Sequence, residues 1–459
     1  MHIIPNICFA LLLCGGNLVS AQVPTPALWD TLPFKPNWTP RAFYEDTVED
    51  WFYIGGEFSK VDTQECNFLM RYNGATWECA QNGQYIPSPG FNITQYQDEL
   101  YVSGFGLVKG DGMEWETIDS INLMLPVVYP YQGDLLLGGR FEEVEGFPSQ
   151  AMVRWDGSSY SSFHGLDTVI GDNFVSAVAE YQGQLYVGGN INNVPPYHEI
   201  LRWDGQAWRD VGGGLPNGGL GHVTDMVVYQ DELYVGGIFT TATGSPGNNI
   251  ARWNGQSWDG LGGGIGTGIE GWDGVSDLFV FEGYLWVVGV FEYAGGIPAQ
   301  HLAKWDGEKW CSLGSRFDNG LSRLGSYRDT LYLGGGFWSI DGDSSYYRIA
   351  KLLDPHFSDT CSAPVVNTSV RGAPVRADLF TLYPNPAQGL LTLKAAQLPP
   401  DEFTVTISDA QGRAVWQREV SHPGGDFRQV IDLGEVSEGL YVVRIVGRER
   451  QEVQRVWVR

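Results

Sequence analysis

Residues 229–239 read YQDELYVGGIF and residues 250–258 read IARWNGQSW, and the chain repeats this pair of motifs. The first motif follows an apolar run, turns at its Gln-Asp pair and alternates apolar with polar residues up to a double glycine. The second has an Asn-Gly turn between two short apolar runs, a strong hairpin signal because both central residues of a type I′ turn need positive φ. One copy therefore predicts four antiparallel strands.

Further copies of both motifs lie on either side, about 50 residues apart. The first motif recurs as WFYIGGEF at 51–58, YQDELYVSGF at 96–105, YQGDLLLGGRF at 131–141, YQGQLYVGGNI at 181–191, FEGYLWVVGVF at 281–291 and YRDTLYLGGGF at 327–337. The second recurs as LMRYNGATW at 69–77, MVRWDGSSY at 152–160, ILRWDGQAW at 200–208, LAKWDGEKW at 302–310 and, incompletely, RIAKLLD at 348–354. The second unit is short, with only Met113-Glu-Trp115 as its second half.

A repeat of this length built from four short strands is typical of a β-propeller, in which each unit forms one blade. We therefore expect an all-β fold over residues 22–354 with seven blades, and six blades as the alternative because the second unit is short. The last unit lacks its own final strand, and residues 27–32 match the missing piece. The N-terminal strand is thus expected to complete the last blade, which removes the open sheet edges.

The repeat LYVGGxF followed by IARWDGxxW resembles the kelch-like, galactose-oxidase-type propeller repeats of secreted bacterial proteins. The resemblance covers roughly residues 27–354 and implies a secreted propeller that binds something. It carries no oxidase activity over, because we find no set of Tyr, His and Cys ligands for copper in the chain. The glycine doublets and the recurring tryptophans are interpreted as packing residues; these are Gly188-Gly189, Gly236-Gly237, Trp155, Trp203, Trp253 and Trp305.

Residues 1–21 are predicted to be a signal peptide for export. Ile7 to Leu13 is mostly apolar, and Val19-Ser20-Ala21 offers small residues before a cleavage between Ala21 and Gln22. The alternative, a lipoprotein cut before Cys14, is disfavoured because Leu13 is large. No stretch of the chain is long and apolar enough to span a membrane.

Removing this segment leaves four cysteines, and an even number in an exported chain favours disulfides. Cys66 and Cys79 flank one predicted hairpin, so we expect them to pair. That leaves Cys311 with Cys361, a bond that would tie the end of the repeat array to its body.

The sequence changes character after residue 354. Residues 355–379 are rich in Pro, Ser, Thr and Asn and are predicted to be a linker. Residues 380–459 lack the tryptophan repeat but still predict short strands, at 390–393, 403–408, 414–420, 429–433, 441–446 and 452–458. A tail of this length with six or seven short strands predicts a small C-terminal β-sandwich.

Three motifs of this tail, LYPNP at 382–386, SDAQGR at 408–413 and EGLYVVR at 438–444, resemble the type A C-terminal sorting domain of cargo for the type IX secretion system of Bacteroidota. The motif residues are Pro384, Asn385, Pro386, Gly412, Gly439 and Tyr441. The resemblance implies that the outer-membrane translocon is the partner of residues 380–459, and that the product is released or attached to the cell surface. The alternative is an ordinary β-sandwich with a Pro-Asn-Pro turn before its first strand.

Composition excludes several classes of partner. The chain has 28 basic and 54 acidic residues, a formal net charge of −26. Binding to nucleic acid or to anionic lipid needs the opposite sign, so both are disfavoured. With 43% hydrophobic residues the chain can build a large core, which argues against wholesale disorder.

The sequence offers little catalytic chemistry. It has no Gly-x-Ser-x-Gly, His-Glu-x-x-His or Gly-x-x-x-x-Gly-Lys motif, and its seven histidines are scattered singly. We therefore assign no catalytic residue and no cofactor. Asp341 and Asp343 are weak candidates for a calcium site, because hard cations prefer several carboxylates and carbonyls, although a solvated turn explains the pair as well.

Two classes of function remain. Thr240 to Asn249, Asn192 to Glu199 and Glu292 to Gln300 vary in length and polarity while the repeat cores stay alike. Variable loops on a rigid scaffold suit recognition, so we favour a non-catalytic module that binds a glycan or a protein at the cell surface or in the medium. The alternative is a secreted hydrolase, lyase or oxidase on the same scaffold, since fold alone cannot decide function.

Overall fold

The computed structural model describes most of the chain in two compact units, residues 1–367 and 368–459. The described residues run from 28 to 458, apart from 82–89, 120–124, 142, 145–146, 150, 171–172, 192–198, 216–220, 240–247, 267–273, 363–379, 389, 399–400, 409–412, 435, 438 and 447–450. The predicted signal peptide with its cleavage site, most of the predicted linker and the motif residue Gly412 therefore lie outside the described residues.

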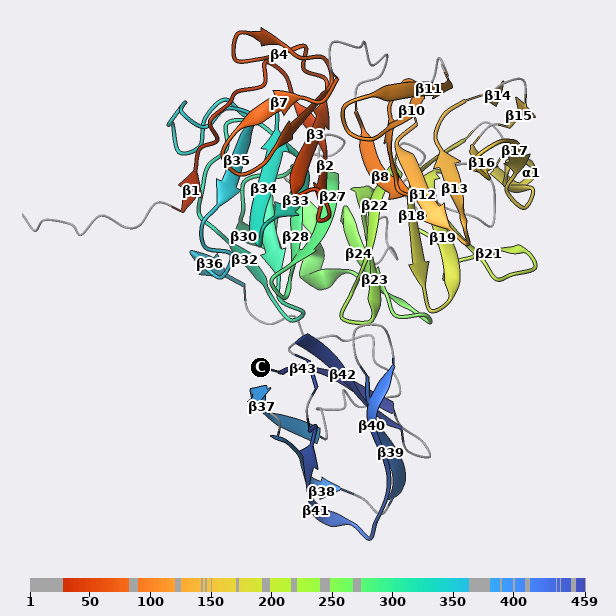
Figure 1. The fold of residues 1–459 in the computed structure, drawn as a ribbon, viewed down its shortest axis with the longest axis vertical. Coiled ribbons are helices and arrows are strands. Elements are labelled where there is room, and N and C mark those ends of the chain that lie inside the picture. The colour runs from red at the N-terminus through yellow and green to blue at the C-terminus, as the bar shows by residue number, and fades with distance from the viewer. Residues whose placement is uncertain are drawn as a thin grey trace, which may run out of the picture. The chain divides into compact units, whose positions relative to one another are not determined.

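The regular secondary structure in the described part of the first unit is almost entirely strand. Its repeat units each form one antiparallel sheet in which four strands pair in order, from a first to a fourth strand (Figure 1). The first strands are β2 (Pro40–Asp46), β8 (Asn92–Tyr96), β12 (Val127–Tyr131), β18 (Phe174–Tyr181), β22 (His222–Tyr229), β27 (Gly274–Phe281) and β33 (Leu321–Tyr327). The second strands are β3 (Trp51–Gly56), β9 (Glu99–Ser103), β13 (Asp134–Gly138), β19 (Gln184–Asn190), β23 (Glu232–Ile238), β28 (Tyr284–Val290) and β34 (Thr330–Gly335).

The second half of each motif pair supplies the outer strands. The third strands are β6 (Leu69–Tyr72), β10 (Leu107–Gly110), β16 (Met152–Trp155), β20 (Ile200–Trp203), β24 (Ile250–Trp253), β31 (Leu302–Trp305) and β35 (Ile349–Leu352). The fourth strands are β7 (Trp77–Cys79), β11 (Trp115–Asp119), β17 (Tyr160–Ser162), β21 (Trp208–Asp210), β25 (Trp258–Asp259), β32 (Trp310–Ser312) and β1 (Trp29–Asp30). The predicted four-strand unit is thus found at each repeat.

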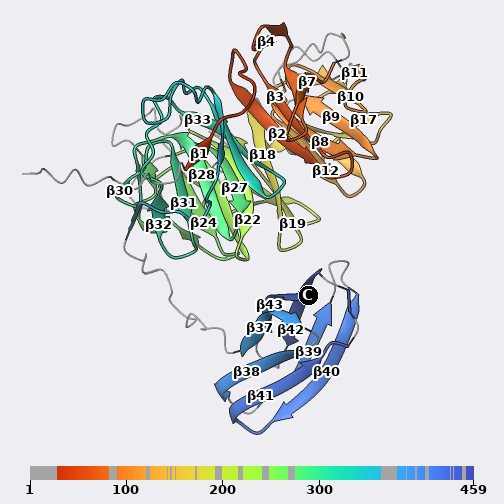
Figure 2. The ribbon, with the colours of Figure 1, turned by 60° about the vertical axis from the view of Figure 1, so that its left-hand side comes forward.

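Strand β1 comes from the other end of the unit. Trp29 pairs with Leu352 and Asp30 pairs with Lys351, so the N-terminal strand completes the sheet formed by the last repeat, as predicted. Each first strand contacts the first strand of the next sheet, and β33 in turn contacts β2 (Figure 2). The sheets therefore follow one another in a closed cycle of contacts.

Short elements complete the first unit. Two-residue strands form small hairpins or sheets in the connections; they are β4 (Lys60–Val61), β5 (Gln64–Glu65), β14 (Glu143–Val144), β15 (Phe147–Pro148), β26 (Ile265–Gly266), β29 (Tyr293–Ala294) and β30 (Ile297–Pro298). The described helices are the single turns α1 (Leu166–Ile170) and η1 (Leu261–Gly263). Almost no helix was expected, and almost none is present in the described residues.

The double glycines let the second strand pack closely against both the next sheet and the first strand of its own sheet. A Cβ on Gly188 would lie 2.7 Å from Val223 Cγ1, and one on Gly236 would lie 2.5 Å from Val275 Cγ1, both on the next sheet. The second glycine of each pair faces the backbone of its own first strand, where a Cβ on Gly237 would clash with the His222 carbonyl oxygen. The packing interpretation of these doublets is confirmed.

The aromatic repeat residues join neighbouring sheets. The indole N–H of Trp258 donates to Val211 O of the preceding sheet's last connection, and that of Trp310 donates to Leu261 O. At the opposite ends of the strands the hydroxyl of Tyr229 donates to Gly283 O in the turn of the next sheet. These bonds recur because the motifs recur, so the sequence repeat also carries the sheet-to-sheet contacts.

Both predicted disulfides are present. Cys66 is bonded to Cys79, with their Cα atoms 5.5 Å apart. Cys311 is bonded to Cys361, with their Cα atoms 4.1 Å apart. Cys361 lies in β36 (Thr360–Cys361), which pairs with β32 as the fifth strand of that sheet, so this bond holds the segment after the last repeat against the first unit.

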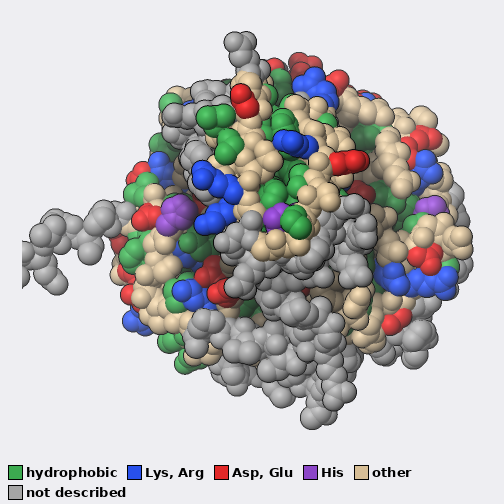
Figure 3. All heavy atoms as spheres, turned by 90° about the horizontal axis from the view of Figure 1, so that it is seen from below, with side chains coloured by type: hydrophobic (Ala, Val, Ile, Leu, Met, Phe, Trp, Pro, Cys, Tyr) green, Lys and Arg blue, Asp and Glu red, His purple; other side chains and the backbone are tan. Residues whose placement is uncertain are grey.

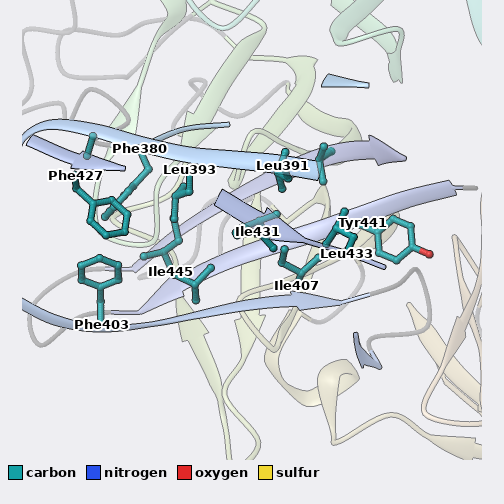
Figure 4. Close-up of a cluster of buried hydrophobic side chains, with 14 of the residues drawn as sticks. Phe380, Leu391, Leu393, Phe403, Ile407, Phe427, Ile431, Leu433, Tyr441 and Ile445 are labelled. Atoms are coloured by element: carbon teal, nitrogen blue, oxygen red, sulfur yellow. The ribbon is translucent and has the colours of Figure 1, made fainter. Parts of the chain in front are cut away.

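The second unit consists of seven strands in the order β40-β39-β42-β43-β37-β38-β41. They are β37 (Phe380–Gln388), β38 (Leu390–Leu398), β39 (Asp401–Ser408), β40 (Ala414–His422), β41 (Gly425–Asp432), β42 (Gly439–Val446) and β43 (Gln451–Val458). Figure 4 shows apolar side chains of β37, β38 and β41 facing those of β39 and β42. The rings of Phe380, Phe403 and Phe427 meet edge to face there, with centroids 5.3–5.9 Å apart.

Strand β37 corrects one part of the sequence interpretation. The predicted strands began at residue 390, and the alternative interpretation placed residues 384–386 in a turn before the first strand. Instead these residues lie inside β37, where pairing with β38 is interrupted between Tyr383 and Gln388 and Ala387 pairs in parallel with Val458 of β43. Proline has no N–H to donate to a sheet, so Pro384 and Pro386 interrupt one pairing and let the strand join another.

Candidate functional site

A cavity of 420 Å³ lies where the first strands of all the sheets meet. Its polar lining includes Arg41 of β2, Asn92 of β8, Asp225 of β22 and Arg323 of β33. Apolar residues of β12 and β18 complete the lining, among them Val127, Val128, Phe174 and Val178. The cavity is therefore built from the N-terminal halves of strands that are far apart in the sequence.

A recurring β-bulge aims side chains into this cavity. In five of the described sheets the pairing of the first and second strands skips one residue of the first strand. The skipped residues, all of which line the cavity, are Arg41, Ser176, Thr224, Ser276 and Ser322. A bulge of this kind bends the strand and redirects one side chain, which is why it serves sites at sheet ends.

Three of the bulge hydroxyls bind the next sheet. Ser176 Oγ donates to Val223 O at 2.5 Å, and Thr224 Oγ1 donates to Val275 O at 2.6 Å. Ser322 Oγ donates to Pro40 O at 2.8 Å, which joins the last first strand to β2. These hydroxyls are thus committed to holding the sheets together.

In two successive sheets, those of β22 and β27, the residue after the bulge also bonds to the sheet that follows. Asp225 Oδ2 accepts a hydrogen bond from the backbone N–H of Leu278 at 2.8 Å. Asp277 Oδ2 accepts one from the backbone N–H of Leu324 at 2.6 Å, and its Oδ1 lies 2.7 Å from Arg323 Nη1. Asp277 is only 4% exposed, so its charge depends on Arg323.

Burial and mutual repulsion change the acidity of this pair. Burial, together with the nearby charge of Asp277, raises the pKa of Asp225 to about 8. Burial likewise raises the pKa of Asp277, and the Arg323 guanidinium opposes that rise. One proton is therefore retained between the two carboxyl groups at neutral pH.

Charges on the outside are mixed. On the face shown in Figure 3, acidic and basic side chains are interspersed, with hydrophobic side chains between them. On that face, the net charge of −26 is not gathered into a single acidic field.

The calcium candidates are placed in a tight turn. Asp341 Oδ1 accepts the backbone N–H of Arg316 at 2.9 Å, and Asp343 Oδ1 accepts that of Ser345 at 2.8 Å. The bond from Ser345 lowers the pKa of Asp343. Among the described residues no group of three or more His, Cys, Asp or Glu side chains is placed to hold a metal ion. The calcium site stays a prediction.

The sorting-motif residues lie in the second unit. Residues 384–386 are in β37, and Gly439 and Tyr441 are in β42. Gly439 has a φ of 156°, and a Cβ added there would meet nothing within 4 Å, whereas Tyr441 is 3% exposed. The Tyr441 hydroxyl donates to Ser437 O at 2.8 Å, which fixes the residues leading into β42.

Sequence reasoning missed the cavity residues Asp225 and Arg323 and the buried Asp277, which pairs with Arg323. A signal for them exists in the first strands, where HVTDMVVY at 222–229, GVSDLFVF at 274–281 and LSRLGSY at 321–327 place a hydroxyl residue before a charged one. The variable loops 192–199 and 240–249 lie largely outside the described residues, whereas residues 293–298 form the hairpin of β29 and β30. No helix within the described ranges is long and apolar enough to cross a membrane.

Comparison with known families identifies the tail. Residues 381–459 match the model of a family described as the secretion system C-terminal sorting domain. This match confirms the predicted type IX sorting domain. The protein is therefore exported, to the cell surface or to the medium.

Comparisons of the whole chain are distant. No curated protein matches it. Among solved structures, the GH74 enzyme of Niastella koreensis is 9% identical with a TM-score of 0.36, and the match covers 93% of this chain and 74% of that one. Dimeric latent PorU from Porphyromonas gingivalis is 11% identical with a TM-score of 0.16, and the match covers 80% of this chain and 32% of that one. The chain thus spans about a third of the length of PorU.

Proposed function

We propose that this exported protein is a kelch-like β-propeller of seven blades with a C-terminal β-sandwich, and that it binds a ligand without transforming it. The ligand site is the cavity of the first strands together with the surface around its mouth. The outer-membrane type IX translocon is the partner of residues 380–459.

The arrangement of the sheets supports the propeller. Each repeat forms one four-stranded sheet, the first strands contact one another in sequence order, and β33 contacts β2. The pairing of β1 with β35 closes such a ring by joining the two ends of the array in one sheet. Seven sheets built on this plan among the described residues correspond to seven blades.

One observation carries the binding interpretation: three hydroxyls and one carboxylate of the cavity, and the buried Asp277 beside it, are engaged in bonds between sheets. Thr224, Asp225 and Asp277 each hold a backbone group of the following sheet. A catalytic acid, base or nucleophile must instead reach the substrate with a group whose proton can move. Groups tied up in this way shape a rigid, polar concave surface, which suits recognition.

A secreted enzyme is the second candidate, and the acidity of Asp225 favours it. A carboxyl group that keeps its proton at neutral pH beside a cavity is the property required of a general acid. His222 also lines the cavity, and burial lowers the pKa of its imidazole. An enzyme would use Asp225 as the acid on a ligand held between β22 and β27.

One experiment separates the two candidates. The exported protein is applied to arrays of glycans and of proteins, and is assayed in parallel against hydrolase, lyase and oxidase substrates. The binding proposal predicts saturable binding of a ligand and no turnover. Reproducible turnover that Asp225→Asn abolishes would overturn it in favour of the enzyme.

A further inference from the structure

We infer that Trp38 and Trp338 form a platform beside the cavity that binds the sugar rings of an uncharged glycan. The inference rests on the proposed binding function and names the class of ligand. It starts from two large apolar side chains that the fold leaves in solvent.

Both indoles are more than half exposed. Trp38, just before β2, is 52% exposed, and Trp338, just after β34, is 56% exposed. Although they lie 300 residues apart in the sequence, both rings face the guanidinium of Arg348, with ring centroids 5.0 and 5.4 Å from its carbon. The Tyr347 ring lies 5.1 Å from the same group. One cation thus brings the aromatic rings together.

The platform is held from below. Arg348 is 4% exposed, and its Nη1 donates to Thr39 Oγ1 at 3.3 Å. The indole N–H of Trp38 donates to Glu57 Oε2 at 2.9 Å, and the backbone N–H of Trp338 donates to Asp318 Oδ1 at 2.7 Å. Because these contacts hold the Trp38 indole and the backbone of Trp338 before any ligand arrives, less ordering entropy is lost on binding.

Arg348 breaks the repeat at this position. The residue before the third strand has positive φ in several sheets. In each of them its backbone N–H donates to the carbonyl oxygen of the residue that ends the first sequence motif. In three sheets its side chain also accepts a loop N–H: Glu199 from Ile191, Asn249 from Phe239 and His301 from Phe291. An arginine cannot accept a hydrogen bond. Phe68, at the same position of the first sheet, cannot accept one either, but the Arg348 side chain instead contacts the rings of Trp38, Trp338 and Tyr347.

Polar groups for hydroxyl recognition lie next to the rings. Glu57, which holds Trp38, lines the cavity together with Arg41, and Arg41 Nη2 lies 3.3 Å from Glu57 Oε1. A carboxylate offers several acceptor sites and a guanidinium offers several donors in one plane. The platform and the cavity are thus connected through this ion pair.

These features match the chemistry of a sugar. A pyranose ring has an apolar face of C–H groups that packs on an aromatic plane, and a rim of hydroxyls that bonds planar polar side chains. Asn37 and Ser339 are polar and Phe337 is buried, so in these two segments the exposed apolar surface is confined to the rings. Protein partners instead bury a continuous patch with an apolar centre. The net charge of −26 disfavours anionic polymers, which leaves an uncharged glycan.

The test uses the exported protein and immobilised neutral hexasaccharides of glucose, mannose, galactose, xylose and N-acetylglucosamine. We expect saturable binding to at least one of them. Trp38→Ala and Trp338→Ala should each weaken that binding at least tenfold, whereas Trp38→Phe and Trp338→Phe, which keep an aromatic face, should lose less. Phe357→Ala is the matched control, because Phe357 is 42% exposed and follows β35, outside the platform.

The outcomes separate this inference from the proposed function. Binding to proteins but to none of the neutral glycans would overturn the glycan platform and leave the binding function standing. Glycan binding that is equal in the wild type and in folded Trp38→Ala and Trp338→Ala would also overturn the platform. Release of new reducing ends from a bound glycan would instead overturn the non-catalytic function. Thermal melting of each variant shows whether it is folded. Where an alanine variant does not fold, the binding of the corresponding phenylalanine variant decides the outcome.

Discussion

The carboxylate of Asp277 on β27 accepts the backbone N–H of Leu324 on β33 at 2.6 Å. Asp225 on β22 has the same relation to Leu278 on β27, one sheet earlier. In both cases the carboxylate follows a β-bulge and bonds the residue two positions after the bulge of the next sheet. Neighbouring sheets are thus joined at the points where their first strands bend.

Loss of the Asp277 carboxylate should destabilise the first unit. Asp277→Ala leaves the Leu324 N–H without its acceptor and the Arg323 guanidinium without its counter-ion, in a buried position. We expect the free energy of unfolding to fall by about 3 kcal/mol. Denaturant unfolding followed by tryptophan fluorescence measures this. Glu308→Ala, at an exposed position in the turn between β31 and β32, should change it by less than about 0.5 kcal/mol. Equal effects of the two variants would contradict the role of Asp277.

The proton held by Asp225 should make stability depend on pH. In the unfolded chain this carboxyl loses its proton near pH 4. The folded protein keeps it up to about pH 8 because burial raises the pKa of Asp225. Between these values the unfolded state binds fewer protons, so this group lowers stability as pH rises.

Asp225→Asn should therefore reduce the fall in melting temperature between pH 5 and pH 8. The asparagine keeps an acceptor for the Leu278 N–H and has nothing to titrate. Calorimetric melting of both proteins across this range checks the prediction. Parallel curves for the two proteins would contradict it.

A side chain on the second glycine of a doublet should not be tolerated. A Cβ on Gly237 meets the backbone of β22, which cannot move without breaking the sheet. We expect Gly237→Ala to destabilise the protein by about 1–3 kcal/mol, the usual cost of overpacking. Gly336→Ala is the control, because a Cβ there meets only the Asn319 side chain at 3.4 Å. A smaller loss for Gly237→Ala than for Gly336→Ala would show that the doublet is not a packing feature.

The two disulfides should differ in their contribution to stability. Cys311 and Cys361 are 50 residues apart in the sequence, and Cys66 and Cys79 are 13 apart. If a disulfide acts mainly by restricting the unfolded chain, the disulfide that closes the longer loop stabilises the folded protein more, within a typical range of about 2–4 kcal/mol. The double variant Cys311→Ala/Cys361→Ala should therefore unfold at lower denaturant than Cys66→Ala/Cys79→Ala. The reverse order would indicate that native contacts dominate.

Removal of the second unit should prevent export. In a host with the type IX system, a chain lacking residues 380–459 should stay inside the cell, because the matched sorting domain is gone. Immunoblots of periplasm, surface and medium measure its distribution. Normal amounts of the truncated protein in the medium would contradict this function of the tail. Folding of the retained protein, checked by protease resistance, separates a sorting defect from degradation.

Regular local patterns made much of the fold predictable. Asn-Gly and Asp-Gly turns, double glycines and paired tryptophans act through neighbours at fixed spacing, so the four-strand unit follows from the repeat alone. The pairing of β1 with β35 was predictable because the last repeat lacks a strand that the N-terminus supplies. Both disulfides followed from the small number of cysteines, and the sorting domain followed from its motifs.

The sequence alone determined the repeated four-stranded sheet, the completion of the last sheet by the N-terminal strand, the disulfide pairs and the export of the protein. Only the tertiary structure decided that Asp225 and Arg323 line one cavity while Asp277 pairs with Arg323, that Trp38 and Trp338 share the cation of Arg348, and that β37 runs through its prolines. The reason is physical: a hairpin depends on residues a few positions apart, whereas these groups come from different sheets. Their distances depend on how the sheets pack, which no local pattern encodes.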